Sequence, residues 1–277
     1  GERRREFSAD PPLSSCGVQQ AMELGSFLKK EGINRLVSSP YLRTLQTSQY
    51  VAWKNGLYIE VEPGVCETPH NPANIPGVED RFGCIPSIDL AHRSWTSGPD
   101  AESDELECLP RSIDAAQGIV SSMRDGDNVA VITHASIAMA VVASLASDCR
   151  RNNMDQDRAQ GLRRTLERIE AASPCGVYKL EFDVQRKLWT SDLKCYNFFL
   201  SQPISSTKPW RFSIDFSMHS WWDKWEELAY KYACARVRPS RLRPSGSRSP
   251  DPSRQSSETT RSNEIRSNEI RLQTFMV

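Results

Sequence analysis

The sequence predicts an α/β protein, a three-layer sandwich in which helices flank a mostly parallel β-sheet. Segments with strand-like and helical patterns alternate from Pro12 to about Tyr232, which favours such a sheet. Two short apolar segments, residues 33–37 and 128–132, each lead directly into polar residues and then into a helical pattern. Because open α/β sheets bind ligands at the carboxyl ends of their strands, we expect the functional residues in these loops.

The first elements follow from apolar spacing and end signals. A helical stripe runs from Val18 to Leu28, and Gly32 stands where a helix C-cap is expected. The strand 33–37 comes next, and a second helix runs from the following loop to Asn55-Gly56.

The later elements are less regular. A strand is expected at residues 57–61, and the proline-, glycine- and acid-rich region 68–110 is typical of an insertion that selects substrates. The charged segment 148–172 has helical spacing and is interpreted as an exposed excursion from the core. Two strands, Val177–Phe182 and Leu188–Leu193, predict a β-hairpin.

The composition divides the chain into two parts. We expect a folded domain over residues 1–232 and a disordered tail over residues 233–277, because the tail is rich in arginine, serine and proline and buries too little apolar surface to offset its chain entropy. The formal net charge is +0, so overall charge gives no argument for a nucleic-acid or membrane partner. The eight cysteines contain no Cys-x-x-Cys pair, and reduced thiols in a cytoplasmic or nuclear protein are expected.

Three strand ends carry candidate site residues. Arg43 lies in the loop after the strand 33–37, Glu67 in the loop after the strand 57–61, and His134 directly after Thr133. A guanidinium is a permanently charged, fork-shaped phosphate ligand, and an imidazole titrates near neutral pH. Together they favour phosphoryl chemistry.

These residues lie in motifs that resemble the histidine phosphatase superfamily, the phosphoglycerate mutase-like fold. The branch with the most similar motifs contains the suppressor-of-T-cell-receptor-signalling (STS/TULA) phosphatases. The matching stretches are Gly1-Glu2-Arg3, Asp10 to Ser14, Gly17 to Ala21, Ser38 to Thr47, Val61 to Gly64 with Glu67, and Thr133 to Ser136.

The resemblance implies a function and the roles of four residues. Arg3 and Arg43 would bind the phosphoryl oxygens, His134 would be the second histidine of the pocket, and Glu67 would protonate the leaving oxygen. The reaction would be phosphomonoester hydrolysis through a phosphohistidine, without a metal or cofactor. The substrate would be a phosphorylated protein or small molecule, with phosphotyrosine or aryl phosphates favoured.

The resemblance also shows what is missing. In the family the nucleophile is the histidine of an Arg-His-Gly motif, and this sequence starts at the glycine, Gly1. We expect the sequence to be a fragment whose upstream part supplies the first strand and the Arg-His pair. The alternatives are a non-catalytic phosphate-binding or scaffolding pseudophosphatase and a sugar-phosphate mutase or bisphosphatase of the same superfamily.

Other candidate residues receive structural interpretations. Glu60 and Glu62 compete with Glu67 for the role of acid, as do Glu79 and Asp80 in the insertion. Three histidines lack partners at metal-ligand spacing and are expected to pack or lie at the surface: His70, His92 and His219. A helical tryptophan cluster predicts a core or, if exposed, a homodimer contact: Trp221, Trp222 and Trp225.

Overall fold

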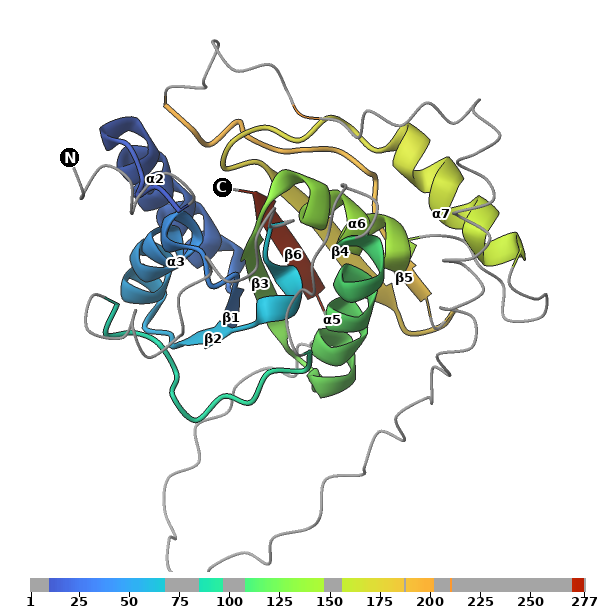
Figure 1. Cartoon of the computed structure of the whole chain (residues 1–277), viewed down its shortest axis with the longest axis horizontal. Helices are drawn as coiled ribbons and strands as arrows, with labels where there is room; N and C mark the ends of the chain where they lie inside the picture. Colours follow the sequence, from blue (N-terminus) through green and yellow to red (C-terminus); the bar gives the residue numbers. More distant parts are fainter. Residues whose placement is uncertain are drawn as a thin grey trace, which may run out of the picture.

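The computed structural model describes residues 10–67, 85–96, 108–146, 156–186, 188–201, 210 and 271–276. Its centre is a six-stranded sheet with the order β2-β1-β3-β6-β4-β5 (Figure 1). The strands are β1 Arg35–Ser38, β2 Ile59–Val61, β3 Asn128–Thr133, β4 Val177–Asp183, β5 Leu188–Thr190 and β6 Arg271–Met276. The first four strands of the order are parallel to one another. β4 is antiparallel to β6 and to β5, as the predicted hairpin requires.

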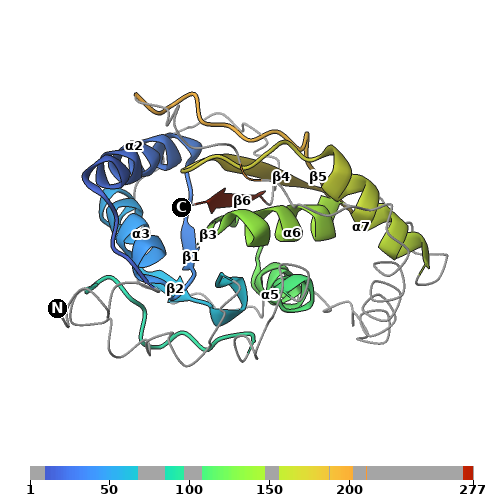
Figure 2. The ribbon, with the colours of Figure 1, turned by 45° about the horizontal axis from the view of Figure 1, so that its top comes forward.

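Helices cover the sheet on both sides. They are α2 Ser15–Glu31, α3 Leu42–Asn55, α5 Cys108–Ser122, α6 Ala135–Ala146 and α7 Gln156–Arg168, with the short 3₁₀ helix η1 Pro63–Val65. Figure 2 shows α2 and α3 together on one side of the sheet, and α5, α6 and α7 on the other. The predicted three-layer α/β fold with a mostly parallel sheet is confirmed.

The strand sequences explain the two cores. Consecutive side chains of a strand point to opposite faces, and both faces of this sheet are covered, so the inner residues of β1 and β3 are apolar. In β3, Val129 and Val131 join the core beneath α5 and α6. Ala130 and Ile132 join the core beneath α2 and α3.

The C-terminal ends of α2 and α3 follow the predicted glycine signals, whereas their N-terminal ends differ from each other. Ser14 caps α2, with its Oγ accepting a hydrogen bond from Gly17 N at 3.1 Å. Gly32 and Gly56 end α2 and α3 with φ of 73° and 68°, a region that glycine adopts without steric cost. The side chain of Tyr41, the N-cap residue of α3, makes no cap hydrogen bond.

Two segments differ from the sequence expectation. The segment 148–172 was expected outside the core. Instead, Leu162 and Leu166 of α7, and Ile169 just after it, are buried in the same core as α6. Their apolar stripe is short, but α6 is apolar on nearly every side and gives this stripe a surface to pack against.

Within the expected disordered tail 233–277, residues Arg271–Met276 form β6. This stretch contains three apolar residues in six, unlike the arginine- and serine-rich sequence before it.

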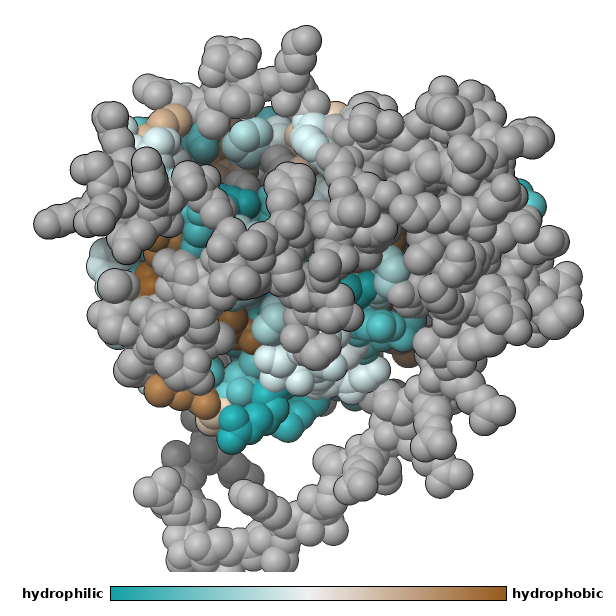
Figure 3. Space-filling model, in the orientation of Figure 1, coloured by the Kyte–Doolittle hydropathy of each residue, from teal (hydrophilic) through white to brown (hydrophobic). Residues whose placement is uncertain are grey.

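The visible surface of the described residues mixes both kinds of side chain. In Figure 3, hydrophilic and hydrophobic residues alternate over this face rather than forming one apolar area. Within the part of the chain that the structure describes, none of the helices combines the length and apolar character needed to cross a membrane. Most of the insertion 68–110 and the predicted tryptophan cluster lie outside the described residues.

Candidate active site

The structure brings Arg43, Glu67 and His134 together at the carboxyl edge of the parallel strands. Arg43 Nη2 lies 3.1 Å from Glu67 Oε2 and 3.0 Å from His134 Nδ1. Glu67 Oε2 lies 3.2 Å from the same imidazole nitrogen. Three loops that are far apart in sequence therefore meet within hydrogen-bonding distance.

His134 follows β3 directly and is fully buried. Its Nε2 lies 2.8 Å from Ser39 Oγ, the residue after β1, and the Tyr41 ring packs edge-on against the imidazole with centroids 5.1 Å apart. On the other side of the ring, Arg43 can only donate and a carboxylate such as Glu67 can only accept. The protonation of Nδ1 thus decides which of the two residues it bonds.

Arg43 is placed by the start of α3. Its guanidinium carbon lies 4.7 Å from the centre of the Tyr41 ring, a cation–π distance, and its side chain keeps 20% of its surface exposed. The start of the helix is fixed from a distant segment, because Asp10 Oδ1 accepts a hydrogen bond from Leu42 N at 2.8 Å. The guanidinium is therefore oriented before any ligand arrives.

Glu67 is placed by the loop that contains η1. Arg111 of α5 donates to Gly64 O at 2.8 Å and to Cys66 O at 3.0 Å. Thr133 Oγ1 donates to Val65 O at 2.5 Å, which ties the loop to β3. The Glu67 side chain remains 38% exposed, so it is held next to His134 and still faces solvent.

The competing carboxylates have structural partners instead. Glu62 is fully buried and accepts hydrogen bonds from Gly64 N, Trp95 N and Thr96 Oγ1 at 2.9, 2.8 and 2.5 Å. Glu60 forms a two-point ion pair with Arg35 at 3.0 and 2.7 Å. Among the carboxylates in the described ranges that the sequence offered as acids, Glu67 is the one beside Arg43 and His134. Glu79 and Asp80 lie outside these ranges.

The electrostatics of the site follow from its burial and its two guanidiniums. Burial alone would raise the pKa of Glu67, but His134, Arg43 and the Ser136 hydroxyl outweigh it and lower the pKa to about 2. Burial lowers the pKa of His134, with Arg43 and Arg111 acting in the same direction and Glu67 against them. At neutral pH we therefore assign an ionised Glu67 and a neutral His134 beside the permanently charged Arg43, the group that can bind an anion.

These pKa shifts predict a loss of stability in acid. The unfolded chain binds a proton at histidine more readily than buried His134 does, so its contribution is complete above about pH 6.5 and is lost below it. The free energy of unfolding in urea is expected to be lower at about pH 5.5 than at about pH 7.5. In His134→Gln this difference should shrink, and an unchanged difference would contradict the assignment.

Sequence reasoning missed Ser39, Asp10 and Arg111. Ser39 and Asp10 belong to matched motifs, but nothing in the sequence indicates that one contacts the histidine and the other caps α3. Arg111 binds backbone carbonyls, which leave no trace in the pattern of side chains. Arg3 lies outside the described residues. His92 lies elsewhere, with its ring against Trp95 at 4.8 Å between centroids.

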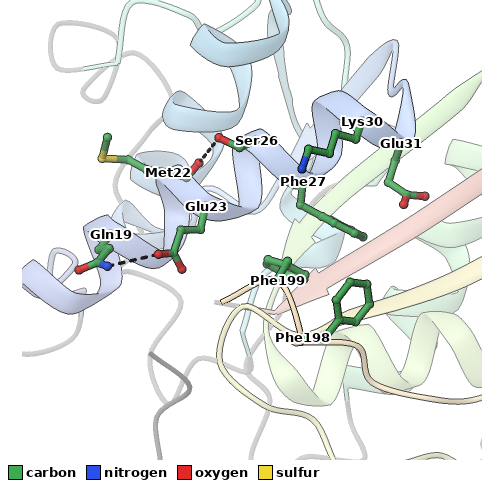
Figure 4. Close-up of a pocket in the computed structure, with 9 residues that line it drawn as sticks. All are labelled: Gln19, Met22, Glu23, Ser26, Phe27, Lys30, Glu31, Phe198 and Phe199. Atoms are coloured by element: carbon green, nitrogen blue, oxygen red, sulfur yellow. Dashed lines mark hydrogen bonds between the residues drawn. The ribbon is translucent and has the colours of Figure 1, made fainter. Parts of the chain in front are cut away.

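A surface groove of about 680 Å³ lies apart from this site, between α2 and residues 198–199. Figure 4 shows Phe27 of α2 next to Phe198 and Phe199, and polar residues including Glu23 along the same helix. None of Arg43, Glu67 and His134 lines it. Among the residues with a described placement, no group of three His, Cys, Asp or Glu side chains could hold a metal ion.

A family model matches the chain over most of its folded part. The model is that of the histidine phosphatase superfamily, branch 1, and it matches residues 1–187. The chain belongs to this superfamily. The predicted family is therefore confirmed. The superfamily includes both phosphatases and mutases, so membership alone does not identify the substrate.

Two kinds of relative match the chain, one with higher identity over a short stretch and one with lower identity over most of its length. The ubiquitin-associated and SH3 domain-containing protein A of Mus musculus is 39% identical over 69 residues, which are 23% of this chain and 11% of that protein. The probable phosphoglycerate mutase GpmB of Shigella dysenteriae is 23% identical over 205 residues, covering 69% of this chain and 81% of that protein. The chain thus spans about a tenth of the mouse protein.

Solved structures of phosphatases are also similar. The ecdysone phosphate phosphatase from Bombix mori, in complex with tungstate, is 25% identical, with a TM-score of 0.46 over 55% of this chain and 62% of that one. A mycobacterial glucosyl-3-phosphoglycerate phosphatase in complex with inorganic phosphate is 19% identical, with a TM-score of 0.46 over 69% and 91%.

Proposed function

We propose that this chain carries the phosphate-binding and acid groups of a phosphomonoester hydrolase that acts through a phosphohistidine. The observation that carries the proposal is the convergence of Arg43, Glu67 and His134 at 3.0 to 3.2 Å. Each group has a use in phosphoryl transfer, and membership of the superfamily supports the same chemistry. The catalytic domain would comprise residues 1–232 together with β6, which pairs with β3 and β4 in the same sheet.

Arg43 would bind the phosphoryl group of the substrate. A guanidinium forms two parallel charge-assisted hydrogen bonds to phosphate oxygens, and charge gathers on these oxygens in the transition state. Arg43 is partly exposed and now bonds Glu67, so a phosphate can take over its hydrogen bonds. Arg3 is proposed as a second phosphate ligand on its match to the family motif.

Glu67 would protonate the leaving oxygen. With a pKa of about 2 in the free site it is ionised and has no proton to give. A phosphate dianion that binds Arg43 would remove the favourable partner and add a like charge, and both changes raise a carboxyl pKa. Substrate binding would thereby prepare the acid.

His134 would hold a phosphoryl oxygen next to Arg43. It is buried and fixed by Ser39, so it can donate a hydrogen bond from Nδ1 without first reorganising. At neutral pH the imidazole of His134 is neutral, so one of its two nitrogens carries a proton and can donate it in a hydrogen bond to a phosphoryl oxygen.

We further propose phosphotyrosine in proteins or other aryl phosphates as the substrate class. Support comes from the 39% identity with the mouse ubiquitin-associated and SH3 domain-containing protein A and from the spacing between Val61-Glu62-Pro63-Gly64 and Glu67.

The first test is binding of tungstate, an analogue of the transferring phosphoryl group, by the unmodified chain. Calorimetry should show saturable binding at one site, with displacement by inorganic phosphate. A chain that binds neither anion would contradict the proposal. The rival function is a phosphate-binding domain without catalysis. Binding without any turnover in a form that carries the nucleophile would support this rival.

The role of Glu67 predicts a dependence on the leaving group. In an active form of the protein that carries the histidine nucleophile, Glu67→Gln should slow phenyl phosphate hydrolysis at least about tenfold more than p-nitrophenyl phosphate hydrolysis. Only the poorer leaving group needs a proton. The measurement is kcat on the two substrates, with Glu60→Gln as the control. Equal losses on both substrates would show that Glu67 is not the acid.

A further inference from the structure

Ser39 is the first residue after β1, and hydrogen bonds hold its backbone on both sides. Its amide nitrogen donates to Ile132 O of β3 at 2.9 Å. Its carbonyl oxygen accepts from Ser38 Oγ at 3.0 Å and from Thr44 Oγ1 at 2.9 Å. The residue is fully buried. These bonds involve only its backbone, so its own hydroxyl serves other partners.

The Ser39 hydroxyl makes two contacts with described residues. Tyr41 N lies 3.4 Å from Oγ, and a backbone amide can only donate, so the hydroxyl oxygen accepts in this contact. His134 Nε2 lies 2.8 Å from the same oxygen. Of these two contacts, Nε2 is the one that can accept the hydroxyl hydrogen. Ser39 therefore donates to His134.

A donating Ser39 fixes the tautomer of His134. A neutral imidazole carries its hydrogen on one ring nitrogen and accepts on the other. Burial lowers the pKa of His134, so its ring is neutral at neutral pH. Since Nε2 accepts from Ser39, the hydrogen of the ring lies on Nδ1, the nitrogen that faces Arg43 and Glu67.

The position of the Glu67 carboxylate fits a hydrogen on Nδ1. Glu67 Oε2 lies 3.2 Å from His134 Nδ1 and 3.1 Å from Arg43 Nη2. A carboxylate oxygen accepts more than one hydrogen bond, so Oε2 accepts from both groups. The 3.0 Å between Nδ1 and Nη2 then separates two donors that share one acceptor. A phosphoryl oxygen is an acceptor of the same kind and can take the place of Oε2 between them.

We propose that Ser39 is a positioning residue that sets the tautomer of His134, so that Nδ1–H and Arg43 Nη2 together bind one phosphoryl oxygen. The inference rests on the proposed function and adds the residue that prepares its histidine. In the opposite tautomer the lone pair of Nδ1 would face the anion and repel it. A hydroxyl orients the ring without the negative charge that a carboxylate partner would bring into an anion-binding site.

Nitrogen-15 NMR of the imidazole side chains at about pH 7.5 measures the tautomer directly. In a neutral ring, the nitrogen that carries the hydrogen and the nitrogen that does not have well-separated chemical shifts. The chain has four histidines, and His134→Gln identifies the signals of His134. We expect the hydrogen on Nδ1 in the unmodified chain, and part or all of it on Nε2 in Ser39→Ala.

Tungstate binding measures the consequence for the site. Ser39→Ala should bind tungstate about tenfold less tightly, because its imidazole no longer holds Nδ1–H toward the anion. Ser39→Thr keeps the hydroxyl and should restore the tautomer and most of the affinity. The matched control is Ser48→Ala. Ser48 is also fully buried and donates to Ser38 Oγ at 2.8 Å, so its loss disturbs the same group of hydroxyls without removing a contact of His134. Tautomer and affinity should stay unchanged in this control.

Three results would overturn the inference. They are a hydrogen on Nε2 in the unmodified chain, a hydrogen that stays on Nδ1 in Ser39→Ala, and equal losses of affinity in Ser39→Ala and Ser48→Ala. A failure of the proposed function looks different. The unmodified chain would then bind no tungstate, while the NMR signals would still report what Ser39 does to the ring.

Discussion

Replacing Arg43 with alanine is expected to weaken tungstate binding about thirtyfold, or about 2 kcal/mol. The guanidinium is the group at the mouth of the site that can make two charge-assisted hydrogen bonds to one oxyanion. Its loss also removes the positive charge that offsets ionised Glu67, which would then repel the anion. Calorimetry on the unmodified chain and on Arg43→Ala measures the difference.

Two controls make this result specific. Arg186→Ala removes an exposed arginine, 74% exposed and paired with Asp183, and should leave tungstate affinity unchanged. Arg43→Lys keeps the charge but loses the planar fork, so its affinity should fall between that of the unmodified chain and that of Arg43→Ala. Equal affinity in Arg43→Ala and the unmodified chain would place Arg43 outside the binding site.

Replacing Glu62 with alanine is expected to destabilise the fold by about 3 kcal/mol. Its buried carboxylate is the shared acceptor for Gly64 N, Trp95 N and Thr96 Oγ1, and each donor would lose its partner. Gly64 lies in a closely packed position, because a Cβ there would lie 2.7 Å from Ala115 Cβ. The measurement is the free energy of unfolding in urea.

Glu60→Ala is the matched control for Glu62. Glu60 pairs with Arg35 where both side chains are about a fifth exposed, and such an ion pair contributes about 1 kcal/mol or less. Glu62→Gln should also be destabilised, since its amide nitrogen cannot accept a hydrogen bond that the carboxylate oxygen accepts, such as the one from Trp95 N. Equal losses in Glu60→Ala and Glu62→Ala would show that the 85–96 segment is not held through Glu62.

The sequence predicted the parts of the fold that depend on local patterns. The glycines that end α2 and α3, the β4-β5 hairpin and the apolar strands β1 and β3 follow from neighbouring residues. The position of β6 depends on pairing between residues that are far apart in sequence, such as Asn128 and Arg271, and no local pattern specifies such a pairing. The burial of α7 depends in the same way on the apolar surface of α6.

The candidate site also combines features that follow from local sequence with features that depend on contacts between distant residues. That Arg43, Glu67 and His134 would lie at one edge followed from their positions after parallel strands. The family resemblance named Glu67 as the acid, but the local pattern did not separate it from Glu62, because that depends on which carboxylate accepts hydrogen bonds from residues 64, 95 and 96. Asp10 and Arg111 act on backbone groups, and the sequence does not display which backbone groups they reach.

The central position of β6 has a consequence for how this protein is made. During synthesis, β3 and β4 are made long before β6. The edge of each strand that later pairs with β6 therefore stays unpaired until then. Unpaired strand edges can pair with other chains, and contacts between distant segments form slowly. We expect the nascent chain to need a chaperone until residues 271–276 have been translated. The sheet would then be completed in one late folding step.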